Sequence, residues 1–207
     1  QDIYEGNRFT QGAAFGGFGL LVDRAGDDRY TSFGYALGFG APLGVGALID
    51  VSGNDFYECG GRYPSAYNET DAPNAHPEDP AFQYDCFGLG TGSGLRVFSK
   101  QPAHRAQSLA GGWGLFIDID GRDRYRHGTA AHFGVGLNID YQGKDRYGSK
   151  GPFYNGGAAW DGSVALAVDG GPDSDFYDLP VSTGLAMGDL GGWGLFIEEG
   201  GADQYAV

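Results

Sequence analysis

The chain has 207 residues, enough for one domain with an ordinary core, and we expect residues 1–207 to form a single repeat domain. Its 14 Phe, 13 Tyr and 3 Trp residues exclude a disordered chain, and no run of about 18 apolar residues predicts a membrane-spanning helix. With 27 acidic and 13 basic residues, the net charge of −14 excludes nucleic acid as an expected partner and favours cations.

One short unit recurs along the chain: an acidic residue, a turn with one glycine, an Asp, a variable residue and a Tyr. A glycine-containing apolar segment of strand type precedes most copies, as in Gly44–Ile49. The unit occurs at Asp23–Tyr30, Asp50–Tyr57, Asp118–Tyr125, Asp140–Tyr147, Asp169–Tyr177 and Glu198–Tyr205.

The period of this unit indicates the fold class. Neighbouring copies start 27, 22, 29 and 29 residues apart, which is too short for a four-stranded propeller blade and fits one coil of a parallel β-solenoid. We therefore predict an all-β solenoid of about eight coils with repeats of 22–30 residues. The stretch between Asp50 and Asp118 is expected to hold about two more units, one of them a degenerate copy over Phe82–Ser99. A strand-rich barrel or sandwich is the alternative.

Two cysteines lie at the same phase of the repeat. Cys59 follows Tyr57 by two residues, and Cys86 follows Tyr84 by two. Equal phase on adjacent coils would place them about 4.8 Å apart, close enough for a disulfide, and a disulfide indicates an extracellular, secreted protein. Two free thiols are the alternative.

The segment between the cysteines predicts an inserted surface loop. Residues Gly60–Ala81 are rich in Pro, Asn, Asp and Glu, which favour loops over strands. The loop contains Asn68-Glu69-Thr70, an acceptor pattern for a glycan that is common by chance.

The acidic residues of the repeat predict a calcium site. In stacked coils, like acids form columns with a spacing of about 4.8 Å, and neighbouring carboxylates then repel by roughly 3.5 kcal/mol at an effective dielectric of 20. Ca²⁺ prefers carboxylate and carbonyl oxygens and would offset this repulsion. The predicted ligands are Asp23, Asp28, Asp50, Asp55, Asp118, Asp123, Asp140, Asp145, Asp169, Asp175, Glu198 and Asp203.

Two other interpretations explain the same acids without a metal. Asp side chains in turns often accept hydrogen bonds from backbone N–H groups two residues on, and nearby arginines could pair with the carboxylates. The glycine of the unit is expected to adopt positive φ in the turn.

The tyrosines of the repeat predict an aromatic column. Asp and Tyr two residues apart share one face of a strand, so both are expected on the sheltered side. The expected column comprises Tyr4, Tyr30, Tyr57, Tyr84, Tyr125, Tyr147, Tyr177 and Tyr205.

These features together predict a structural function. The chain begins and ends at nearly the same phase of the repeat, so its end coils could pair head to tail with further copies of itself in an extracellular filament. The alternative is a monomeric, secreted, calcium-dependent adhesin or glycan-binding domain. A polysaccharide-degrading β-helix enzyme is the second alternative; the chain shows no nucleophile motif, and we expect no enzyme activity.

Overall fold

The computed structural model describes residues 1–60, 62, 86–97, 107–126, 130–148, 156–178 and 185–206. The fold of these residues is all-β: they form strands, turns and no helix, and most strand pairs are parallel. Consequently, the described chain offers no helix of the length and apolarity needed to cross a bilayer. The predicted glycan acceptor Asn68, Tyr84 and nearly all of the loop Gly60–Ala81 lie outside the described residues.

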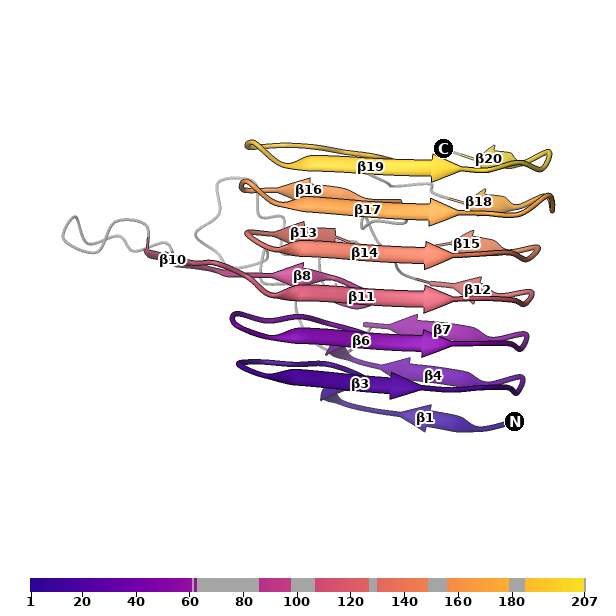
Figure 1. The fold of residues 1–207 in the computed structure, drawn as a ribbon, viewed down its shortest axis with the longest axis horizontal. Coiled ribbons are helices and arrows are strands. Elements are labelled where there is room, and N and C mark those ends of the chain that lie inside the picture. The colour runs from indigo at the N-terminus through magenta and orange to yellow at the C-terminus, as the bar shows by residue number, and fades with distance from the viewer. Residues whose placement is uncertain are drawn as a thin grey trace.

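The sheet with the most strands is parallel (Figure 1). Its strands contain the tyrosines of the repeat. Its register aligns each tyrosine with the next, so that Tyr30 lies beside Tyr4 and Tyr57, and Tyr57 lies beside Tyr125. In spatial order its seven strands are β1 (Ile3–Glu5), β4 (Arg29–Ser32), β7 (Phe56–Cys59), β12 (Arg124–Tyr125), β15 (Arg146–Gly148), β18 (Phe176–Asp178) and β20 (Gln204–Ala206).

A second parallel sheet is formed by the apolar segments that precede each acidic turn. Leu48 pairs with Phe116 and Phe116 with Asn138, in one continuous register. In spatial order its six strands are β3 (Phe18–Val22), β6 (Val45–Asp50), β11 (Trp113–Asp118), β14 (Val135–Asp140), β17 (Val164–Asp169) and β19 (Trp193–Glu198).

Shorter strands form the remaining sheets. β8 (Gly92–Ser93), β13 (Ala130–His132) and β16 (Ala158–Trp160) pair in parallel, as do β2 (Arg8–Thr10) and β5 (Gly34–Ala36). Isolated parallel bridges join Ala14 to Gly40 and Gly40 to Gly92, so these short segments also follow one another in a row. Only β9 (Leu95–Val97) and β10 (Gln107–Leu109) pair antiparallel among the described strands, in a hairpin that projects from the stack (Figure 1).

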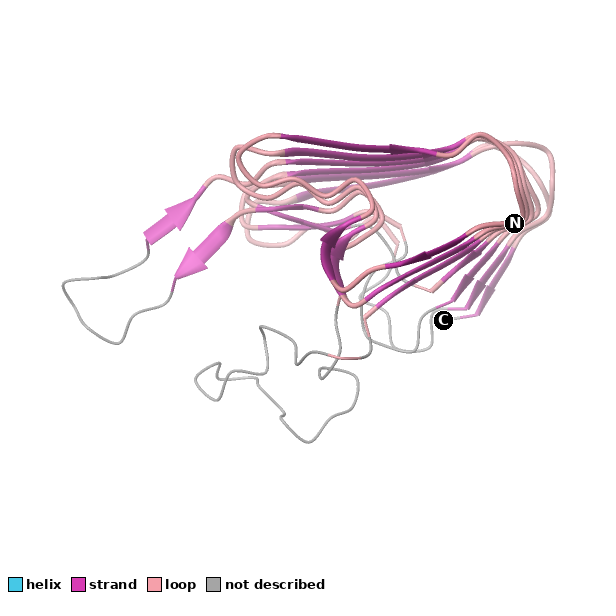
Figure 2. Cartoon of the chain, turned by 90° about the horizontal axis from the view of Figure 1, so that it is seen from below, coloured by secondary structure: helices cyan, strands magenta, loops and turns pink. Residues whose placement is uncertain are grey.

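This arrangement is compatible with the predicted β-solenoid. The described chain passes from the six-stranded sheet to the seven-stranded sheet and then to the short strands before it repeats (Figure 2). The longest sheet has seven strands, compared with the expected eight coils. β6 lies directly beside β11 and β7 directly beside β12, so the degenerate copy at Phe82–Ser99 contributes no strand to either long sheet in the described residues.

The core lies between the two long sheets and is dominated by the inward-facing tyrosines. Tyr30, Tyr57, Tyr125 and Tyr177 are buried and pack with aliphatic and aromatic side chains such as Leu48 and Phe116. The residue between each Asp and Tyr faces outward, as the alternation of a strand requires, and Arg29, Arg124 and Arg146 are all exposed there.

The outer side of the six-stranded sheet is apolar at every position. On each strand three alternate residues point outward, and Figure 2 shows no described element above this sheet. We call this surface the apolar face. It comprises Phe18, Leu20, Val22, Val45, Ala47, Ile49, Trp113, Leu115, Ile117, Val135, Leu137, Ile139, Val164, Leu166, Val168, Trp193, Leu195 and Ile197.

The predicted disulfide between Cys59 and Cys86 is confirmed, with a Cα–Cα distance of 5.5 Å. Its setting differs from the prediction, because the tyrosine beside Tyr57 on the next strand is Tyr125 and not Tyr84. The bond instead joins the end of β7 to the start of the segment that leads to β8, and so closes the base of the predicted insertion.

Candidate metal centre

The leading acid of each repeat forms a first column at the carboxyl end of the six-stranded sheet. Asp50, Asp118, Asp140, Asp169 and Glu198 are the last residues of their strands, and the parallel register places each beside the next. Asp23 directly follows β3. Asp50 and Asp118 are fully buried, as expected for side chains that alternate with the outward residues of the apolar face.

The second Asp of each repeat forms another column, one residue before the strands of the seven-stranded sheet. Each carboxylate accepts a hydrogen bond from the backbone N–H of the equivalent Asp in the preceding repeat. Asp28 N–H donates to Asp55 Oδ1 at 2.6 Å, Asp55 N–H to Asp123 Oδ1 at 2.6 Å, and Asp123 N–H to Asp145 Oδ1 at 2.7 Å. The series continues through Asp175 to Asp203.

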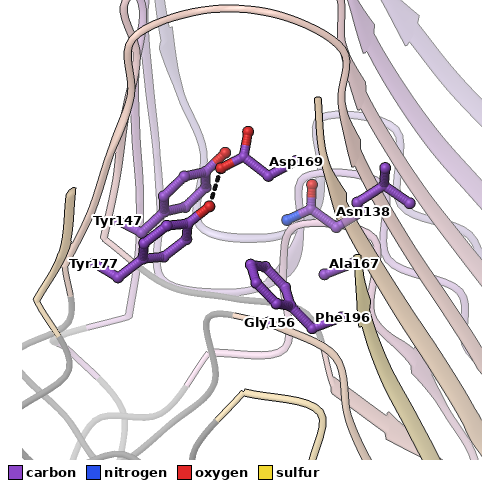
Figure 3. Close-up of a pocket in the computed structure, with 8 residues that line it drawn as sticks. Asn138, Tyr147, Gly156, Ala167, Asp169, Tyr177 and Phe196 are labelled. Carbon is purple, nitrogen blue, oxygen red and sulfur yellow. Dashed lines mark hydrogen bonds between the residues drawn. The ribbon is translucent and has the colours of Figure 1, made fainter. Parts of the chain in front are cut away.

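Tyrosine hydroxyls donate to the first column. Tyr57 Oη donates to Asp118 Oδ2 at 2.8 Å, and Tyr125 Oη lies 2.7 Å from Asp140 Oδ2 and 3.1 Å from Asp118 Oδ2. Figure 3 shows the same arrangement further along, where Tyr177 donates to Asp169 beside the stacked ring of Tyr147. The sequence predicted that the tyrosine and the second Asp of each repeat lie on one side of the chain. It gave no indication that the tyrosine bonds a leading acid, because this bond joins different strands.

The tyrosine rings form the predicted stack except at Tyr84, because Tyr57 stacks directly on Tyr125. The ring centroids of Tyr4 and Tyr30 lie 4.6 Å apart, and those of Tyr57 and Tyr125 lie 5.2 Å apart, both nearly parallel. The stack continues through Tyr147 and Tyr177 to Tyr205. The stack fixes the position of each tyrosine hydroxyl along the sheet. The carboxylates of the first column, which accept from these hydroxyls, therefore have the same spacing as the rings.

In the described residues, one oxygen of most column carboxylates lacks a hydrogen-bond partner. The Tyr-bonded acids leave Oδ1 unpaired and the backbone-bonded acids leave Oδ2 unpaired, although all of these side chains are buried. A buried carboxylate oxygen without a partner is costly. The unpaired atoms are Oδ1 of Asp50, Asp118, Asp140 and Asp169, and Oδ2 of Asp28, Asp55, Asp123 and Asp145.

The two columns converge in groups of three carboxylates. Within each group one oxygen from each residue lies within 4.8 Å of the others, a spacing at which one cation could contact all three. The groups are Asp28, Asp50 and Asp55; Asp55, Asp118 and Asp123; Asp123, Asp140 and Asp145; and Asp169, Asp175 and Glu198. Every predicted ligand except Asp23 and Asp203 belongs to one of these groups, and Asp55 and Asp123 each belong to two.

Burial of these acids changes their protonation. Loss of hydration is the main cause, and repulsion from neighbouring carboxylates adds to it: together they raise the pKa of Asp118 to about 8 and that of Asp123 to about 10. The same causes raise the pKa of Asp55 to about 7 and that of Asp145 to about 10. Without a cation, the buried groups therefore favour a proton as their countercharge.

The predicted positive φ is found in some of the acidic turns and not in others. Gly26, Gly171 and Gly201 have positive φ values of 155°, 102° and 85°, whereas Gly53, Gly121 and Gly143 do not adopt the left-handed region. A Cβ atom on Gly121 would lie 2.1 Å from the carbonyl oxygen of Gly53 and 2.5 Å from Asp123 Oδ2. Glycine is required because the backbones of successive turns and the carboxylate approach too closely for any side chain.

The two interpretations without a metal account for only part of the site. Backbone N–H groups do bond the second column, but they come from the preceding repeat rather than from two residues on; Ala25 N–H to Asp23 is a bond of the expected local kind. In the described part of the chain, Arg29 and Arg126 form ion pairs with Glu58, and Arg146 forms one with Asp178. Glu58 and Asp178 belong to neither column. Neither the backbone hydrogen bonds nor the arginine ion pairs supply a partner for the unpaired carboxylate oxygens.

Comparisons with known proteins add no assignment: no family model, curated protein or solved structure matches this chain. The candidate centre therefore depends on its own geometry.

Proposed function

We propose that the chain is a calcium-stabilised β-solenoid and a structural subunit of an extracellular filament. In this proposal each strand of the six-stranded sheet belongs to one coil, and the acidic turns connect the two long sheets. Two observations carry the calcium assignment: buried carboxylate oxygens lack a hydrogen-bond partner, and the carboxylates of the two columns approach one another in groups of three. The disulfide between Cys59 and Cys86 supports an extracellular location.

Calcium suits the groups better than a smaller cation would. Ca²⁺ takes six to eight oxygens in flexible geometry, whereas Mg²⁺ demands near-octahedral geometry and keeps several waters. Each group offers three carboxylates, all of them buried except the half-buried Glu198, and burial disfavours an ion that keeps several waters. Because Asp55 and Asp123 are shared between groups, bound ions would form a row along the stack.

A matched pair of variants tests the calcium assignment. Asp118→Asn removes the charge of a buried group member, whereas Asp120→Asn changes an exposed residue two positions on. We expect calcium to raise the melting temperature of the parent chain and of Asp120→Asn, with a smaller rise for Asp118→Asn. Isothermal titration calorimetry with Ca²⁺ and with Mg²⁺ gives the affinities. A parent chain whose melting temperature is the same in calcium and in chelator would refute the assignment.

The filament part of the proposal is supported by the unpaired edges of the described sheets. β1 and β20 lie at opposite ends of the stack, so β20 of one copy could pair with β1 of the next and place Tyr205 on Tyr4 (Figure 1). The six-stranded sheet has one strand fewer, and the joint therefore leaves room for one more strand between β19 and the next β3.

A proline at the free edge tests the filament. Arg29 N–H donates to Asp2 C=O, and Ile3 occupies the equivalent position in β1, so its N–H faces away from β4. Ile3→Pro removes this donor without affecting the pairing of β1 with β4. We expect electron microscopy to show filaments for the parent chain and for Ile3→Val, but not for Ile3→Pro. A parent chain that stays monomeric in calcium would favour the adhesin alternative.

A further inference from the structure

The apolar face is the largest feature of the fold that neither the calcium assignment nor the end-to-end joint uses. Its side chains form three rows across the six strands: aromatic residues and valines, then mainly leucines, then isoleucines and valines. The face is most open at Trp193, 72% exposed, Phe18, 70% exposed, and Trp113, 57% exposed. No position in the three rows carries a charged or polar side chain.

A parallel sheet with one uncovered apolar side is an unusual arrangement. All-parallel sheets occur almost only where both sides are covered, because both sides are hydrophobic. The inner side of this sheet packs on the core through Leu48 and Phe116, but the described residues place no element on the outer side. The outer side therefore has the composition of a surface that is buried in the functional state.

We propose that this face pairs with the same face of a second copy of the chain. Strands of six residues at about 3.3 Å per residue and six strands at about 4.8 Å spacing give a flat area of roughly 600 Å² per copy. Full overlap of two copies would bury about 1,200 Å² in total, which reaches the range of specific interfaces of about 1,200–2,000 Å². Two flat sheets packed face to face about 10 Å apart would form the interior of a sandwich.

Charge favours a second copy over a lipid surface. Amphipathic surfaces that bind membranes usually add basic residues that attract anionic headgroups, whereas this chain has 27 acidic and 13 basic residues. The face itself carries no charge, so two copies could meet there without placing like charges in the interface. A twofold dimer uses the identical surface on both copies, so the contact stops at two chains. It is therefore a lateral contact, distinct from the end-to-end joint.

Analytical ultracentrifugation over a concentration series tests the pairing, in calcium and in the Ile3→Pro background so that end-to-end growth does not interfere. We expect a monomer–dimer equilibrium. Leu137→Lys places a charge near the centre of the face and should weaken dimerisation by at least about 30-fold, the effect of losing an interface hot spot. Phe176→Lys makes the same change on the outer side of the seven-stranded sheet and should leave the dimer intact.

Circular dichroism melting of both lysine variants separates loss of pairing from loss of folding. If Leu137→Lys does not fold, the milder Leu137→Thr should still weaken the dimer. A parent chain that is monomeric at every concentration would overturn the proposal, and so would a Leu137→Lys variant that folds and dimerises like the parent. Flotation with phosphatidylcholine vesicles tests the lipid alternative: a monomer that binds them would replace the second copy with a membrane. None of these outcomes depends on whether filaments form.

Discussion

At the scale of single residues, most column carboxylates use only one of their two oxygens in a hydrogen bond. That oxygen accepts from a tyrosine hydroxyl or a backbone N–H, which fixes the side chain, and the other oxygen is buried without a partner. Fixed carboxylates cannot move apart to relieve their repulsion. A countercharge must therefore come to them, and a proton and a divalent cation compete for this role.

Because of this competition, the stability of the calcium-free protein should fall as the pH rises, the opposite of the usual effect of carboxylates that are paired in the folded state. The pKa of Asp118 is raised to about 8 and that of Asp123 to about 10, compared with about 3.9 for Asp in an unfolded chain. The folded state thus binds more protons than the unfolded state above about pH 4, and stability is lost as the pH rises through the folded pKa values. In chelator we expect the melting temperature to fall from pH 5 to pH 9. Excess calcium should flatten this fall, and a chelated protein that gains stability over this range would contradict the expectation.

The glycines of the acidic turns are expected to be intolerant of even one methyl group. A Cβ on Gly121 would lie 2.1 Å from the carbonyl oxygen of Gly53, so the turns would have to separate. We expect Gly121→Ala to cost about 1–3 kcal/mol, as overpacking typically does. Gly17→Ala is the control, because a Cβ at Gly17 has no neighbour within 4 Å and the residue lacks positive φ. Urea denaturation of both variants measures the difference, and equal midpoints would argue against close stacking of the turns.

At the scale of elements, the disulfide holds the base of an insertion. Cys59 ends β7, and Cys86 begins the segment that leads to β8, with a sequence separation of 27 residues. Ser32 on the neighbouring strand donates to Cys59 Sγ at 3.0 Å, so the bond is anchored in the sheet. The bond thus ties the two described ends of the insertion to the sheet.

Removal of the disulfide should lower stability without changing the columns. Closing a loop of this length contributes about 3.5 kcal/mol in the chain-entropy model. We expect the double variant Cys59→Ser with Cys86→Ser to lose roughly this amount in urea denaturation and to keep its calcium-induced rise in melting temperature. The parent chain in reductant should match the variant. A variant that folds but no longer responds to calcium would show that the bond also positions the acids.

The sequence allowed the columns to be predicted but not the number of strands. The distance from the leading acid to the tyrosine is almost constant, so residues such as Asp50 and Asp118 had to align once the strands paired in parallel. Phe82-Gln83-Tyr84 resembles the end of a repeat, yet Tyr57 stacks on Tyr125, because local similarity does not specify which strands become neighbours. The tyrosine–carboxylate bonds and the apolar face were also missed, since both depend on contacts between strands.

At the scale of the whole molecule, each strand of the long sheets contacts mainly its neighbours along the stack. Stability in such a molecule is approximately a sum of repeat and neighbour contributions, so the end strands should open first. We expect slower hydrogen exchange at amides of β11 and β14 than at those of β3 and β19. Mass spectrometry of peptides from these strands measures the difference. Uniform exchange would instead indicate that the described strands unfold as a single cooperative unit.

The ladder hydrogen bonds of both long sheets run along the stack, and the two chain ends lie at its opposite ends (Figure 1). A pulling force applied to those ends would therefore load the ladder hydrogen bonds of one pair of strands at a time. Outside the stretch of 68 residues between Asp50 and Asp118, each released repeat of 22 to 29 residues would lengthen the chain by roughly 70–100 Å at about 3.3–3.6 Å per residue. Under tension the molecule would extend in steps of similar size on either side of the long stretch between β6 and β11, and it would absorb mechanical work gradually.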